Sequence, residues 1–97
     1  MKAFTLDDHI AIELKDPEFR LHYNRELLIN AVAKMIVELR RSNNLTQMEL
    51  AKKAKTTQSV IARLESGSDE RVPSIDLLSR IASASDARLN ISFTQQI

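Results

Sequence analysis

Hydrophobic side chains recur every three or four residues along most of the chain, which is the spacing of one face of an α-helix. The widest apolar stripe lies between residues 26 and 42 and predicts a helix that faces a hydrophobic core. Its members are Leu28, Ile29, Val32, Ala33, Ile36 and Leu39. A narrower stripe formed by Leu6, Ile10 and Leu14 predicts an earlier helix over residues 4–14.

Residues that favour helix ends mark the boundaries of these patterns. Asp16 before Pro17 is typical of a helix start and predicts a short helix over residues 17–24, in which Phe19 and Tyr23 pair one turn apart. Three hydroxyl side chains, each followed by a helical pattern, mark further helix starts: Thr46, Thr57 and Ser74. They predict short helices over residues 47–54 and 58–66 and a third helix from residue 75.

The pattern changes period near the C-terminus. Leu89, Ile91 and Phe93 alternate with polar residues, and this period of two predicts a short β-strand. A lone strand cannot satisfy its own backbone hydrogen bonds, so it needs a partner, most simply the same strand of a second copy. We therefore expect a homodimer, with these three apolar residues at the dimer contact.

Composition narrows the function classes. The chain has 97 residues, no cysteine and one glycine, which excludes thiolate metal sites and the glycine-rich loops that bind nucleotide phosphates. No apolar run is long enough to span a membrane, and the first ten residues lack the apolar segment of a signal peptide, so we expect a cytoplasmic protein. No arrangement of side chains points to catalysis, so we expect no enzyme activity, no metal and no cofactor.

Charge is unevenly distributed. Residues 27–66 carry seven basic and three acidic residues, a net charge of +4, whereas residues 1–26 have four basic and six acidic residues, a net charge of −2. Residues 67–97 have three basic and four acidic residues, a net charge of −1. A basic middle between acidic ends favours an anionic partner for the middle and a different partner for one end, unless the distribution arose by chance.

Two short helices, each capped by threonine and separated by a brief break, have the layout of a helix-turn-helix. The second helix of such a unit enters the major groove of DNA, where glutamine suits adenine and arginine suits guanine. Residues at helix starts and lysines around the turn suit phosphate oxygens. The predicted DNA-binding residues are Thr46, Gln47, Lys52, Lys55, Thr57, Gln58, Ser59, Ala62 and Arg63. The alternative is a pair of ordinary surface helices.

The same region resembles the helix-turn-helix of the phage repressors of the Xre/Cro–C1 type. The resemblance covers about residues 28–86 and rests on three motifs. They are residues 45–51 (Leu-Thr-Gln-x-x-Leu-Ala), residues 57–67 (Thr-Gln-Ser-x-Ile-x-x-Leu-Glu-x-Gly) and residues 73–82 (Pro-Ser-x-x-x-Leu-x-x-Ile-Ala). The resemblance implies a compact bundle of five helices with an ion pair between Arg40 and Glu65.

One residue departs from the pattern of that family. Lys55 stands at the turn position where the family most often has glycine. A left-handed backbone conformation costs a lysine roughly 1 kcal/mol because its Cβ approaches the following carbonyl oxygen. We therefore expect the turn, and with it the pose of the second helix, to be slightly altered, while the fold is retained.

The flanks of this region resemble a second family. Residues 13–20 (Glu-Leu-Lys-Asp-Pro-Glu-Phe-Arg), like the alternating segment after the domain, resemble the HigA-type antitoxins. The resemblance implies a protein that represses its own operon and neutralises HigB, a RelE-like mRNA endonuclease toxin. Because a toxin that binds RNA needs a basic face, the acidic residues 1–26 are the expected toxin-binding arm. Its expected anchors are Leu6, Ile10, Leu14, Phe19 and Tyr23, and its expected steering charges are Asp7, Asp8, Glu13 and Glu18.

The sequence thus predicts an all-α fold. It consists of an N-terminal helical arm (residues 1–26), a five-helix Cro/C1-type DNA-binding bundle (residues 27–86) and a short C-terminal β-strand within residues 87–97. The predicted function is an antitoxin that binds double-stranded operator DNA as a homodimer and also binds a HigB/RelE-like toxin. One alternative is a stand-alone Xre-type repressor whose arm packs on its own bundle. The other is a protein inhibitor without DNA binding, which Gln47, Gln58 and Arg63 disfavour.

Overall fold

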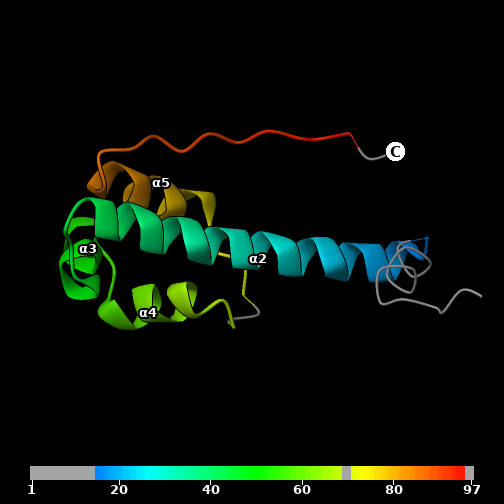
Figure 1. Ribbon diagram of the computed structural model, residues 1–97, viewed down its shortest axis with the longest axis horizontal. Coiled ribbons are helices and arrows are strands. Elements are labelled where there is room, and N and C mark those ends of the chain that lie inside the picture. Colours follow the sequence, from blue (N-terminus) through cyan, green and yellow to red (C-terminus); the bar gives the residue numbers. More distant parts are fainter. Residues whose placement is uncertain (1–14, 69–70, 96–97) are drawn as a thin grey trace, which may run out of the picture.

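The computed structural model describes residues 15–68 and 71–95. Within these residues it contains four helices and no strand: α2 (Pro17–Ser42), α3 (Gln47–Lys53), α4 (Gln58–Ser66) and α5 (Ile75–Ala84). Helices α3, α4 and α5 gather around the C-terminal half of α2, and the N-terminal half of α2 extends beyond them (Figure 1). The helix expected over residues 4–14 lies outside the described residues, together with Leu6, Asp7, Asp8, Ile10, Glu13 and Leu14.

The hydrophobic core lies where the four helices meet. Its largest fully buried side chains are Leu50, Ile61 and Ile81, one each from α3, α4 and α5. Helix α2 contributes four members of the predicted apolar stripe: Ile29, Val32, Ala33 and Ile36. Because burying one leucine or isoleucine side chain stabilises a fold by about 1.5–3 kcal/mol, these contacts hold the short helices on α2.

Each described helix begins at the capping residue that the sequence predicts. Four side-chain oxygens accept a backbone N–H of the first turn, those of Asp16, Thr46, Thr57 and Ser74. At Thr46 the capping is reciprocal, because the Glu49 carboxylate also accepts the Thr46 N–H at 3.0 Å. Gly67 ends α4 with a φ of 68°, a left-handed conformation that glycine adopts without a Cβ clash.

The prediction of a five-helix bundle is wrong. The described part of residues 27–86 contains α3, α4, α5 and the C-terminal part of α2, and the helix expected over residues 17–24 is not separate but begins α2, which runs for 26 residues. No glycine or proline interrupts this helix after its first residue, and extending a helix is cheaper than nucleating a new one. None of the described helices, including α2, is both long and apolar enough to cross a membrane.

The β-strand predicted for residues 89–93 is also wrong. Residues 87–95 form an extended tail without regular secondary structure, which runs back towards the N-terminal end of α2 (Figure 1). A strand is defined by hydrogen bonds to a neighbouring strand, and the described residues contain no other strand with which the tail could pair. Leu89 is half-buried against the bundle, whereas Ile91 and Phe93 are exposed.

Candidate nucleic-acid interface

Helices α3 and α4 are joined by a tight turn. Ala54 caps the C-terminus of α3, and Thr57 caps the N-terminus of α4. Between them Lys55 adopts a φ of 57°, so the left-handed lysine considered from the sequence is present. The Thr56 amide donates to the carbonyl of Ala51 at 2.9 Å and closes the turn. The two helices pack directly against each other.

Helix α4 has a buried face and an outward face. Ile61 and Leu64 point into the core. Gln58 and Ser59 are exposed in the first turn, where the helix dipole and the unpaired backbone N–H groups favour anions. Ala62 and Arg63, one turn further along, are half-buried. Gln58 and Ser59 are therefore the accessible members of the predicted base-reading set, whereas Ala62 and Arg63 are only partly exposed.

Positive and hydroxyl side chains surround the start of α4. Lys52 and Lys53 are exposed in the last turn of α3, and Lys55 is exposed in the turn. The hydroxyl of Thr57 accepts the Val60 amide at 3.3 Å as a helix cap, but its own hydrogen remains available to a phosphate oxygen. The geometry thus collects cations and hydroxyl donors beside the exposed end of α4.

A largely buried ion pair connects α2 to the far end of α4. Arg40 donates to both carboxylate oxygens of Glu65, with Nε–Oε2 at 2.7 Å and Nη2–Oε1 at 2.9 Å. Its third nitrogen, Nη1, donates to the carbonyl of Leu45 at 3.0 Å. Gln47 Nε2 donates to Glu65 Oε1 at 3.2 Å, which leaves its other amide hydrogen for a phosphate. The side chains of Arg40 and Glu65 are only 15% and 7% exposed, and the predicted ion pair is confirmed.

The ion pair is charged at neutral pH. Burial alone would raise the pKa of the Glu65 carboxyl, but the hydrogen bonds from Arg40 and Gln47, with the positive charges of Arg40 and Arg41, hold it below its ordinary value. The hydrogen bond to Glu65 in turn raises the pKa of Arg40. Both partners therefore favour the ionised form of the other.

Two side chains that the sequence analysis did not single out connect α5 to this unit. Arg80 Nη1 donates to the carbonyls of Ala54 and Lys55, both at 2.8 Å. Asn43 Nδ2, at the end of α2, donates to the carbonyl of Ser85 at 3.0 Å. These contacts join residues 25 to 42 positions apart, and no local sequence pattern encodes them.

The comparison with known families identifies this arrangement. The sequence model of the family described as Helix-turn-helix matches residues 36–86, just over half of the chain. This chain belongs to the helix-turn-helix family. Members of the Xre/Cro–C1 type are DNA-binding domains and not enzymes. In this helix-turn-helix domain α3 and α4 are the two helices of the motif, and α4 holds the second position, that of the recognition helix in such units. No curated protein and no solved structure matches the chain.

The first prediction concerns the ion pair. Arg40→Met should lower the free energy of unfolding by about 3 kcal/mol at neutral pH, because it leaves a largely buried carboxylate without its charged partner. Glu65 stabilises the native protein above its unfolded pKa, and this contribution is lost as the pH falls through its lower folded pKa. Arg40→Met removes the hydrogen bond and the positive charge of Arg40, so the pKa of Glu65 should rise relative to that in the native protein and the stability deficit should shrink on acidification.

Urea unfolding followed by circular dichroism between about pH 3 and pH 7 tests both parts. The matched control is Arg40→Met combined with Glu65→Leu, which removes both charges and should lose less stability than Arg40→Met alone. A single variant that keeps the pH dependence of the native protein would contradict the prediction.

Proposed function

We propose that this protein is a sequence-specific DNA-binding repressor in which α4 reads bases in the major groove. The observation that carries the proposal is the outward face of α4, with Gln58 and Ser59 exposed beside three exposed lysines. Gln58 and Arg63 are the proposed base contacts, Ser59 and Ala62 lie against the same base edges, and Thr46, Gln47 and Thr57 are the proposed phosphate contacts. Lys52 and Lys55 supply sequence-independent affinity.

The second prediction separates base reading from phosphate contact. Arg63→Ala should weaken binding to the selected operator by about 1–3 kcal/mol and relax specificity at one base pair. Lys52→Ala should weaken binding to all DNA sequences alike and reduce the salt dependence of the affinity by about one released counterion. Fluorescence anisotropy on a duplex that the wild-type protein selects from a random pool, measured over a salt series, provides both values. Unchanged operator affinity in Arg63→Ala would exclude it as a base contact.

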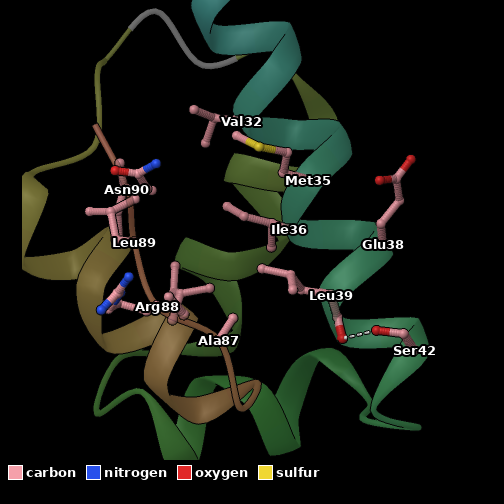
Figure 2. A pocket seen from close by; sticks show the side chains of 13 residues that line it. Val32, Met35, Ile36, Glu38, Leu39, Ser42, Ala87, Arg88, Leu89 and Asn90 are labelled. Atoms are coloured by element: carbon pink, nitrogen blue, oxygen red, sulfur yellow. Dashed lines mark hydrogen bonds between the residues drawn. The ribbon is translucent and has the colours of Figure 1, made fainter. Parts of the chain in front are cut away.

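Two recognition helices in successive major grooves lie about 34 Å apart, which a homodimer would supply. A groove between α2, α5 and the tail, with a cavity of about 530 Å³, supports this assembly (Figure 2). Met35, Leu39 and Leu89 line the groove, and Ile91 and Phe93 follow Leu89 on the exposed part of the tail. Exposed apolar side chains beside an apolar groove are stabilised when a second copy of the chain covers them. Leu89, Ile91 and Phe93 are therefore the proposed dimer contacts.

The third prediction tests the dimer. A chain that ends at Asn90 keeps every residue that lines the groove but lacks Ile91 and Phe93. It should sediment as a monomer at micromolar concentration and bind a two-half-site operator at least about tenfold more weakly, because the two sites no longer act together. The full-length variant Thr94→Ser, which changes an exposed polar residue of the tail, is the control. A truncated chain that remains dimeric would place the dimer interface elsewhere.

A second candidate function, toxin neutralisation, is favoured by the protruding half of α2. The buried residues of α2 begin only at Ile29, and Leu21, Leu27 and Leu28 are 68%, 52% and 52% exposed. The rings of Phe19 and Tyr23 stack with 6.2 Å between their centroids. An acidic arm with uncovered apolar side chains suits a basic, RNA-binding partner. We therefore propose that residues 1–26 bind a HigB/RelE-like toxin. Leu6, Ile10 and Leu14 are proposed as toxin contacts from the sequence alone.

The fourth prediction tests this arm. Removing residues 1–24 should abolish binding to a RelE-like toxin encoded beside this chain and abolish rescue of toxin-arrested cells. DNA binding should persist, because the truncation removes none of the buried residues of α2. Phe19→Ala with Tyr23→Ala in the full chain is a milder variant that should weaken capture of the toxin. If the truncated chain still captured the toxin at full strength, the toxin contact would lie on the helical bundle. If no adjacent reading frame encodes such a toxin, the stand-alone repressor is favoured.

A further inference from the structure

We propose that Arg80 is a positioning residue for DNA recognition, because it holds Lys55 in its left-handed conformation and thereby sets the direction in which α4 leaves α3. The inference rests on the proposed reading of DNA by α4 and adds α5 to the elements that determine its pose. Arg80 lies on α5, and its guanidinium donates to two backbone carbonyls of the turn. Its influence on DNA would therefore be indirect.

Arg80 contacts the two peptide groups that flank the Cα of Lys55. The carbonyl of Ala54 belongs to the peptide group before the Cα of Lys55, and the carbonyl of Lys55 belongs to the peptide group after it. The torsions φ and ψ of Lys55 rotate these two groups relative to each other. Since Arg80 Nη1 donates to both carbonyls at 2.8 Å, one nitrogen restrains both torsions of this residue.

Lys55 needs such a restraint because it has a side chain. Its φ of 57° lies in the left-handed region, where glycine meets no Cβ clash but lysine does. Ala54 is the C-cap of α3, so its carbonyl lies at the negative end of the helix dipole. A guanidinium bound to this carbonyl satisfies it and is favoured by that dipole. The contact thus offsets the strain at the one residue that redirects the chain into α4.

Arg80 is itself oriented by a neighbour on α5. Its Nε donates to Asp76 Oδ2 at 3.0 Å, one helical turn earlier. Helix α5 packs against α3, and this packing holds the helix from which the guanidinium reaches the turn in place. The side chain of Arg80 is 36% exposed and that of Asp76 is 80% exposed, so both can be replaced without opening the core.

A double-mutant cycle between Arg80→Met and Lys55→Gly tests the proposal in the full-length protein. The probe is a duplex that the wild-type protein selects from a random pool. Arg80→Met should weaken its binding by about tenfold when residue 55 is lysine and by no more than about twofold in the Lys55→Gly background, where glycine needs no restraint. The salt dependence should stay the same, because the proposal gives Arg80 a backbone contact within the protein and no phosphate contact. Arg20→Met removes an equal charge from an exposed site on the protruding half of α2 and should change neither the affinity nor its salt dependence.

Amide hydrogen exchange on the free protein gives a readout that does not depend on DNA. Arg80→Met should accelerate exchange of the Thr56 amide, which closes the turn, more than that of the Ile36 amide in the core of α2. Asp76→Ala should show the same pattern to a smaller extent. Equal losses of affinity in both backgrounds, or unchanged protection of Thr56, would overturn the proposal. If the wild-type protein selects no duplex, base reading by α4 fails, and Thr56 exchange alone decides the role of Arg80.

Discussion

The pose of the recognition helix depends on the ion pair between Arg40 and Glu65. This contact joins the end of α2 to the end of α4, and it gathers Gln47 from α3 and the carbonyl of Leu45 at the same point. With both side chains largely buried, any other register of α4 would leave a charged group out of water without a partner. A buried ion pair adds little net stability compared with an apolar pair, so we infer that its main effect here is to exclude alternative arrangements.

Helix α4 needs this support because it is short. It has nine residues and buries only Ile61 and Leu64, and a helix of that length is marginal in water. Arg40 fixes one end through Glu65, and Arg80 contacts the turn before the other end. Two arginines from different helices therefore hold the two ends of α4, and neither occupies its outward face. This arrangement leaves that face free for a ligand.

Much of this structure could be predicted from the sequence where the cause is local. Caps such as Thr46 and Thr57 and the helix end at Gly67 follow from residues within a few positions of each other. The left-handed Lys55 was considered only because the resembled family most often has glycine at this position. The ion pair between Arg40 and Glu65 is not local, and only the resemblance to a known family pointed to it. The helix-turn-helix itself was therefore identified correctly.

The sequence predictions that proved wrong or incomplete also have physical causes. Helix α2 continues through residue 24 because extending an existing helix costs little. Weak local helix propensity is too small an effect to end it there. The alternation at residues 89–93 suggested a strand, but a strand also needs a partner, and sequence period alone does not supply one. The contact from Arg80 to the turn joins residues 25 and 26 positions apart, and the half-burial of Arg63 depends on how α4 packs.

We propose that α4, supported at both ends, presents its outward face to DNA. The most direct measurement is an NMR titration of the isotope-labelled protein with the duplex it selects. We expect the largest chemical-shift changes on the amides of residues 55–63, in the turn and the first part of α4. Changes concentrated along the groove between α2 and α5, with α4 unaffected, would contradict it.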